Sequence, residues 1–196
     1  KQKTAYEVLN VSGVQTCALP ISEASLAAMG QERAAIDALN VFPVPDGDTG
    51  TNMYRTVESA CAAIEEVFDA VEAAAAARPT VSDVSAAMAR GAMLGARGNS
   101  GVILAQIIRG VSGVLDAEGS AGLTGAVVAH ALRAASDNAY AAVSRPVEGT
   151  ILTVARAAAD ASEAAVDEGS DLVEVIESAV AAAHEALALT IEQLPE

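Results

Sequence analysis

The spacing of apolar residues constrains this chain most, because it is helical wherever it is regular. Between residues 51 and 77 the apolar positions recur at intervals of four and three, with acidic residues covering the positions between them. This repeat is typical of an amphipathic helix that packs in a bundle. No stretch alternates apolar and polar residues with a period of two, so no strand is predicted. The sequence therefore predicts an all-α fold. The repeat consists of Met53, Val57, Ala60, Ile64, Val67 and Val71.

Composition limits how such helices can pack and what they can bind. Of the 196 residues, 52% are hydrophobic but only 3% are aromatic, so the core must come from many closely packed, alanine-rich helices. The net charge of −15 argues against binding to nucleic acid or to an anionic membrane surface. No apolar run approaches the ~20 residues of a membrane span, so an integral membrane protein is not expected. Cys17 and Cys61 form no metal-binding motif, which suits a cytoplasmic protein.

The first residues differ in character from the rest of the chain. Lysine occurs only at Lys1 and Lys3, and all later basic residues are arginine. The segment Val11–Ser22 (VSGVQTCALPIS) resembles the in-frame translation of a sequencing adapter. We interpret residues 1–22 as non-native and begin the domain at residue 23. A divergent native N-terminus and a signal peptide are the alternatives, although polar residues interrupt the apolar core that a signal peptide needs.

Seven helices are predicted, joined by short loops, which favours antiparallel neighbours in an up-and-down array. Ser22 and Ser100 are predicted as N-caps of the first and fourth helices, and Ser170 or Asp171 as the N-cap of the last. The predicted ranges are Ser22–Ala38, Thr51–Ala77, Thr80–Ala96, Gly101–Leu115, Leu123–Val143, Thr150–Val166 and Leu172–Thr190.

The loop before the second helix carries the first candidate site. Asp46 and Asp48 flank Gly47, so their carboxylates can converge on one hard cation. No histidine or cysteine stands nearby, and Mg²⁺ therefore fits better than zinc. The alternative is an ordinary Pro/Gly/Asp turn that caps the next helix. Further oxygen-bearing side chains follow at Thr49, Thr51 and Asn52.

A second loop, Gly95–Gly101, has the character of an anion site. Its glycines expose backbone amides at a helix N-terminus, and Arg97 adds a fixed positive charge. No acidic residue occurs between Asp83 and Asp116, so this region is a basic island in an acidic chain that suits a polyphosphate. The loop is not a Walker motif, and the alternative is a tight turn whose glycines allow close packing. A third loop places Thr150 at a helix start, which by its chemistry alone is a capping turn.

Three segments in this order resemble the kinase domain of bacterial fatty acid kinase A, which is of the Dak2 type. The same type includes the nucleotide-binding L subunit of dihydroxyacetone kinase. The segments are Leu39–Met53 (LNVFPVPDGDTGTNM), Gly95–Leu104 (GARGNSGVIL) and Arg145–Val154 (RPVEGTILTV). The resemblance extends over about residues 24–196.

The resemblance implies a barrel of eight antiparallel helices that binds ATP or ADP and two Mg²⁺ ions at one end. It implies that Asp46 and Asp48 are Mg²⁺ ligands, with Asn40 near the metals, and that Arg97 has a catalytic role in holding the transferred charge. The implied nucleotide-binding residues are Thr49, Gly50, Thr51, Asn52, Gly98, Asn99, Ser100, Gly101 and Thr150.

The implied reaction is transfer of a phosphoryl group from ATP to a fatty acid carboxylate held by a DegV-like carrier protein, in phospholipid metabolism. The product is an acyl phosphate. Because a carboxylate is already anionic at neutral pH, the reaction needs positioning and charge neutralisation rather than a strong base. Two alternatives stay open: the L-type subunit of a dihydroxyacetone (glycerone) kinase, and a non-catalytic nucleotide-binding module. A homodimer is compatible with the sequence.

The chain departs from the resembled family at its ends. About seven of the eight family helices are predicted, with the domain truncated at its C-terminus, so we expect the fragment alone to be inactive. The last helix should then lack a neighbour, expose an apolar groove and promote self-association. The predicted stripe comprises Leu172, Ile176, Ala179, Ala183 and Leu187.

Overall fold

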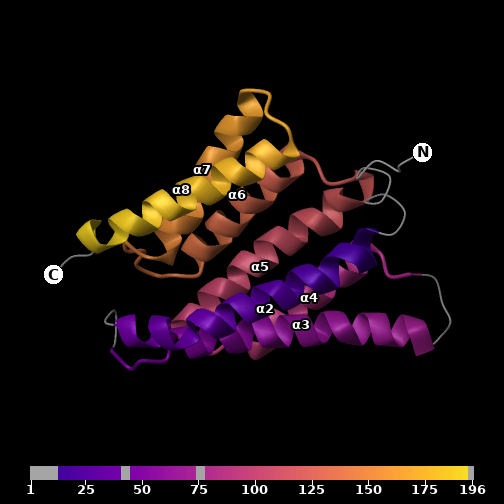
Figure 1. Cartoon of the computed structure of the whole chain (residues 1–196), viewed down its shortest axis with the longest axis horizontal. Coiled ribbons are helices and arrows are strands. Elements are labelled where there is room, and N and C mark those ends of the chain that lie inside the picture. The colour runs from indigo at the N-terminus through magenta and orange to yellow at the C-terminus, as the bar shows by residue number, and fades with distance from the viewer. Residues whose placement is uncertain (1–12, 41–44, 74–77, 194–196) are drawn as a thin grey trace. The chain divides into compact units, whose positions relative to one another are not determined.

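The computed structural model describes residues 13–40, 45–73 and 78–193 (Figure 1). Over these residues the chain forms seven α-helices, one 3-10 helix and no strand, which confirms the predicted all-α class. The chain divides into two compact units, residues 1–105 and 106–196, and α5 contributes to both. The helices are α2 (Gly13–Leu39), α3 (Thr49–Ala73), α4 (Val81–Gly95), α5 (Gly98–Glu118), α6 (Gly125–Ala141), α7 (Ile151–Asp167) and α8 (Leu172–Gln193), with the 3-10 helix η1 at Gly119–Ala121.

In the first unit, α3 packs against both α2 and α4. Midway along α3 the Cys61 thiol donates to the Ser22 carbonyl of α2 at 3.4 Å, and in the first turn of α3 Thr51 contacts Asp37. Since rising residue numbers in α2 meet falling numbers in α3, the two helices are antiparallel.

The contact between α3 and α4 depends on glycine. A Cβ atom on Gly91 would lie 2.7 Å from the Ala63 side chain, and one on Gly95 would overlap the Ser59 side chain. These two positions of α4 lack a side chain where the helices approach each other most closely. The pairing of residue 91 with 63 and of 95 with 59 again gives an antiparallel pair.

The core of the first unit is small and lies between the same helices. Ile64, Phe68 and Val84 form its buried cluster. The hydroxyl of fully buried Thr56 donates to the Asn52 carbonyl at 2.8 Å, so its burial leaves no unsatisfied donor. Partly buried side chains of Ala18, Leu19 and Met88 pack around the cluster.

Within the second unit, apolar and ionic contacts hold the helices together. Val114 of α5 packs against Val127 and Ala131 of α6. Across α6 and α7 the guanidinium of Arg133 forms an ion pair with Glu163 at 2.6 Å. Asp160 pairs with the same arginine.

Local side-chain hydrogen bonds define several helix ends. Before α4, the Thr80 hydroxyl accepts from the Asp83 N–H at 3.1 Å, and the Asp83 carboxylate accepts from the Thr80 N–H at 2.9 Å. This reciprocal capping box satisfies two donors that the first turn would otherwise leave unpaired. Asp171 and Glu174 form the same arrangement before α8, which confirms Asp171 as the cap.

Two predicted helix starts are wrong. α2 begins at Gly13 and continues through Pro20, so Ser22 lies inside it, and the Ser22 hydroxyl donates to the Leu19 carbonyl at 2.9 Å. Packing of the flanking apolar residues on the unit's core offsets the helical hydrogen bond that proline removes. α5 begins at Gly98, so Ser100 is in its first turn rather than before it.

α5 is the helix that bears on the expectation that no segment spans a membrane. Alone among the described helices, it is long and apolar enough, by length and composition, to cross a membrane. Its first turn, however, packs through Gly101 against Thr56, and its later part packs through Val114 against Val127. Both contacts are with other helices of this chain, α3 and α6.

The last helix, α8, buries one face and exposes another. Val175 and Ala179 are buried, whereas Ile176 is 42% exposed and Leu187 is 58% exposed. The predicted exposure is therefore found at Ile176 and Leu187, but it is wrong for Ala179, because that face of α8 packs within the second unit. Other exposed large apolar residues of α8 are Val173, Val180, Leu189 and Ile191.

Candidate functional site

The acidic loop leads directly into α3. Asp46 is exposed and Asp48 is half-buried, with the chain turning at Gly47 (φ +66°) between them. The amide of Asn40 donates to the Asp46 carboxylate at 2.6 Å, so these predicted metal ligands do lie together. The Val41–Val44 part of the motif lies outside the described residues.

A carboxylate that sequence reasoning missed lies beside this loop. Asp37, in the last turn of α2, accepts from the Thr51 N–H at 2.9 Å and from the Thr51 hydroxyl at 2.7 Å. It therefore caps the N-terminus of α3 from a different helix, where a negative charge also favours the helix dipole. Its partner is 14 positions away, so no local capping pattern in the sequence indicates the contact.

The electrostatics of Asp37 agree with this role. Burial raises the pKa of its carboxyl. Hydrogen bonds from Thr51, another from the Gly50 N–H and the charge of Arg33 lower the pKa by more, so that it lies below its ordinary value of 3.8. The carboxylate is thus ionised when it caps α3.

This cap constrains what the start of α3 can offer a ligand. The N–H groups of Gly50 and Thr51 are directed to Asp37. The Thr51 hydroxyl donates a hydrogen bond to the same carboxylate. The lone pairs of the hydroxyl oxygen therefore stay available for a cation. Gly50 is buried against the Arg33 carbonyl, and a Cβ atom there would overlap it.

The glycine loop packs directly against the start of α3. Gly98 has a φ of +61°, and a Cβ atom on it would overlap the side-chain amide of buried Asn52. The Ser100 hydroxyl donates to the Thr49 carbonyl at 3.4 Å. The structure therefore brings two loops together that are about 50 residues apart in sequence.

The amides of the glycine loop lie at the N-terminus of α5. The Gly101 N–H donates to the Arg97 carbonyl at 3.1 Å, which makes it the first helical bond of α5. The amides of Gly98, Asn99 and Ser100 precede this bond, as the first donors of any α-helix do. Asn99 is exposed and Ser100 is half-buried, so a ligand can approach this end of the helix.

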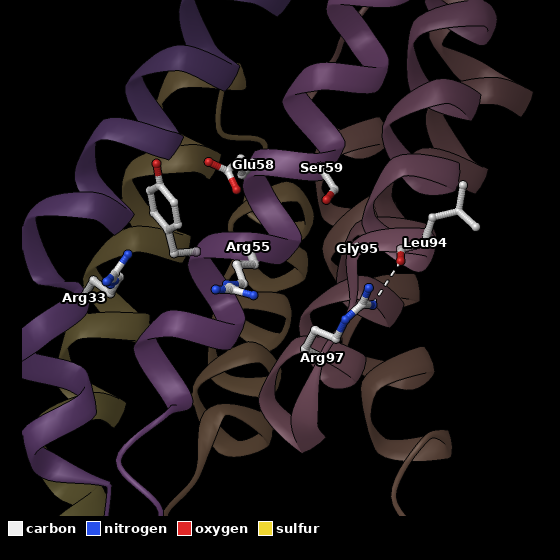
Figure 2. A pocket seen from close by; sticks show the side chains of 8 residues that line it. Arg33, Arg55, Glu58, Ser59, Leu94, Gly95 and Arg97 are labelled. Atoms are coloured by element: carbon white, nitrogen blue, oxygen red, sulfur yellow. Dashed lines mark hydrogen bonds between the residues drawn. The ribbon is translucent and has the colours of Figure 1, made fainter.

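Arg97 lies at the same junction but is oriented toward α4. Its guanidinium donates to the carbonyl of Leu94 at 3.1 Å (Figure 2) and to the carbonyl of Ala96 at 2.7 Å. These carbonyls end α4, so the arginine closes that helix while its remaining N–H groups stay available. The predicted catalytic role of Arg97 stays a prediction.

Thr150 belongs to the second unit and caps α7. Its hydroxyl accepts from the Leu152 N–H at 3.3 Å and donates to the Val147 carbonyl at 2.8 Å. The adjacent Glu148 accepts from Thr153 at 2.6 Å and from Arg156 at 2.7 Å, which braces the loop. The capping turn is confirmed, and a contact of Thr150 with nucleotide stays a prediction.

The donor chemistry of the acidic loop fits a magnesium ion. Carboxylate oxygens of Asp46 and Asp48, with neutral oxygens of Asn40 and Thr51, are the hard ligands that Mg²⁺ prefers. Among the described residues no group of three or more acidic, histidine or cysteine side chains forms a complete metal cage. Mg²⁺ commonly binds through one or two carboxylates together with waters and substrate phosphates, so two aspartates are sufficient.

Comparison with known proteins shows the family of this chain. Residues 43–196 match the DAK2 domain model. The chain is 40% identical over 167 residues to protein YloV of Bacillus subtilis, which covers 85% of this chain and 28% of that protein. It is 41% identical over 152 residues to an uncharacterised protein of Staphylococcus haemolyticus, which covers 78% of this chain and 26% of that protein.

The chain thus spans about a quarter of the length of these relatives. The matched residues include Asp46, Asp48 and the glycine loop. The match covers far more than half of the residues, and the observed fold is all-α as expected. The chain belongs to the DAK2 domain family, a kinase-related nucleotide-binding module.

Proposed function

We propose that this chain binds ATP with Mg²⁺ and forms the nucleotide-binding part of a cytoplasmic kinase that phosphorylates a fatty acid carboxylate. The observation that carries the proposal is the contact between the two loops through Ser100 and Thr49. It joins the start of α3, which directly follows Asp46 and Asp48, to the N-terminus of α5 with its exposed amides. Each feature alone is ordinary turn chemistry, but together they match the opposite needs of a metal and a polyphosphate.

The proposed roles follow from the contacts. Asp46 and Asp48, with Asn40 and the Thr51 hydroxyl, would hold the metal. Because Asp37 takes the amides of Gly50 and Thr51, the phosphate oxygens would bind the amides of the α5 N-terminus instead. When bound, Mg·ATP supplies the phosphoryl group and part of the charge neutralisation.

The proposed acceptor needs no base from this chain, because a carboxylate is deprotonated at neutral pH. What the reaction requires is alignment and positive charge near the transferred group, which Arg97 would add. We propose that a DegV-like protein carries the fatty acid. The product would be an acyl phosphate.

Calorimetry of Mg·ATP binding tests the first part. We expect Asp46→Asn or Asp48→Asn to abolish binding while the helical circular dichroism stays unchanged. Asp69→Asn is the matched control, because it removes one exposed carboxylate elsewhere on α3. Wild-type affinity in either loop variant would overturn the assignment.

The acceptor is tested in the longer protein that carries this domain. Acyl phosphate should form from fatty acid, carrier and ATP, and Arg97→Ala should slow it more than it lowers the melting temperature. Phosphorylation of dihydroxyacetone in place of the fatty acid would favour the L-type kinase subunit. Nucleotide binding with neither reaction would favour a non-catalytic module.

A further inference from the structure

A pocket of about 510 Å³ in the first unit gathers three arginines (Figure 2). Arg33 comes from α2, Arg55 from α3, and Arg97 from the junction of α4 and α5. Glu58 is the only acidic residue among those that line it, beside Tyr54 and Leu94. Neither Asp46 nor Asp48 lines the pocket, so it is separate from the proposed metal loop.

The charge of this pocket is opposite to that of the chain. The whole sequence has 26 acidic residues and 11 basic ones, yet three of the basic residues meet here. The ion pairs found among the described residues involve Arg133, Arg156 and His130, and none includes a pocket arginine. All three arginines are exposed, and a bound anion would neutralise part of their charge.

Two of these side chains are held in place before any ligand binds. The Arg33 guanidinium lies 5.6 Å from the centre of the Tyr54 ring. Arg97 is held by hydrogen bonds to the two carbonyls at the end of α4. These bonds leave other N–H donors of its guanidinium for a ligand. Such preorganisation lowers the entropy lost when a ligand is bound.

We propose that this pocket binds the oxyanion of a small molecule, a carboxylate or a phosphate group, without a metal ion. Guanidinium forks match both groups in geometry and neutralise them directly. The volume lies within the range of roughly 300–1,000 Å³ usual for small-ligand sites. The pocket shares Arg97 with the proposed catalytic machinery, but Arg33 and Arg55 lie outside the proposed nucleotide site, and binding in this pocket needs no metal ion.

Binding is measured by calorimetry and by ¹⁵N–¹H NMR of the arginine Nε groups, in EDTA, with pyrophosphate and with octanoate as probes. At least one probe should shift the Arg33, Arg55 and Arg97 signals, and the stronger probe identifies the phosphate or the carboxylate as the preferred group. Arg33→Gln and Arg55→Gln should each weaken binding about tenfold, the loss of one charge-assisted contact. Glu58→Gln should strengthen binding, because it removes the opposing charge.

Arg90→Gln is the matched control, since it removes an exposed arginine elsewhere in the same unit. It should leave affinity unchanged, and melting temperatures identify any variant that has lost its fold. Equal weakening by Arg90→Gln, or no binding of either probe up to about 10 mM, would overturn the proposal.

Asp48→Asn separates this site from the nucleotide site. It should abolish Mg·ATP binding and leave probe binding in EDTA intact. Probe binding that requires Mg²⁺ and disappears in Asp48→Asn would assign the anion to the metal loop and overturn the proposal. Loss of Mg·ATP binding has no bearing on the arginine pocket.

Discussion

The carboxylate of Asp37 accepts hydrogen bonds from both the N–H and the hydroxyl of Thr51, at 2.9 and 2.7 Å. This pair connects the last turn of α2 to the first turn of α3. The segment between them carries Asp46 and Asp48, so the contact closes the base of the candidate metal loop. An interhelical cap of this kind stabilises the fold and positions the loop at the same time.

Removal of this cap should affect stability and ligand binding together. We expect Asp37→Ala to lower the free energy of unfolding by about 1–2 kcal/mol, the usual cost of a lost N-cap, and to weaken Mg·ATP binding. Urea unfolding and calorimetry measure the two effects. Glu32→Gln, at an exposed position of α2, is the control. Unchanged stability in Asp37→Ala would show that the cap contributes nothing.

Two effects of a side chain at Gly98, overlap with the Asn52 amide and backbone strain from the positive φ, can be measured separately by comparison with Gly169. Gly98 and Gly169 both have positive φ, at +61° and +84°, but only at Gly98 would a Cβ atom meet another group, the Asn52 amide. Alanine at either position should cost about 1–2 kcal/mol from strain, and Gly98→Ala should cost more in melting experiments. Gly98→Ala should also reduce nucleotide affinity, whereas Gly169→Ala should not. Equal effects of both variants would contradict the proposed cradle.

Acid should weaken the contact between α6 and α7. Hydrogen bonds from Arg133 hold the pKa of Glu163 below its ordinary value of 4.5. Because this folded-state pKa is depressed, its stabilising effect is complete above the unfolded-state value and is lost as the pH falls through the folded-state value. Glu163→Gln should therefore make the melting temperature less dependent on pH below about 4.5. Glu185→Gln, exposed on α8, should reproduce the wild-type profile.

The exposed face of α8 should promote self-association. Val180 is 50% exposed and Leu187 is 58% exposed, so glutamate at both should reduce oligomers in sedimentation experiments and leave the melting temperature nearly unchanged. Val175 is fully buried on the opposite face, and Val175→Ala should instead cost roughly 1–3 kcal/mol. A monomeric wild-type chain would contradict the first expectation.

The sequence by itself determined the helical class and several helix ends, because both depend on neighbours within one or two turns. The spacing of apolar residues in α3 indicates a buried face. Thr80 and Asp83, three residues apart, have the spacing of a capping box. The acidic loop and the glycine loop were also recognisable, since each is a continuous motif. Prediction was wrong at Ser22, which is not an N-cap because α2 begins at Gly13 and continues through Pro20.

Only the tertiary structure decided which of these segments meet. The Asp37 cap, the approach of Gly98 to Asn52 and the convergence of Arg33, Arg55 and Arg97 each join residues from different helices. Such contacts depend on how one helix is placed along another, which is set by the summed packing of many small side chains and by close approaches at glycines such as Gly91. No short stretch of sequence contains that information, because each contact is a property of the packed helices.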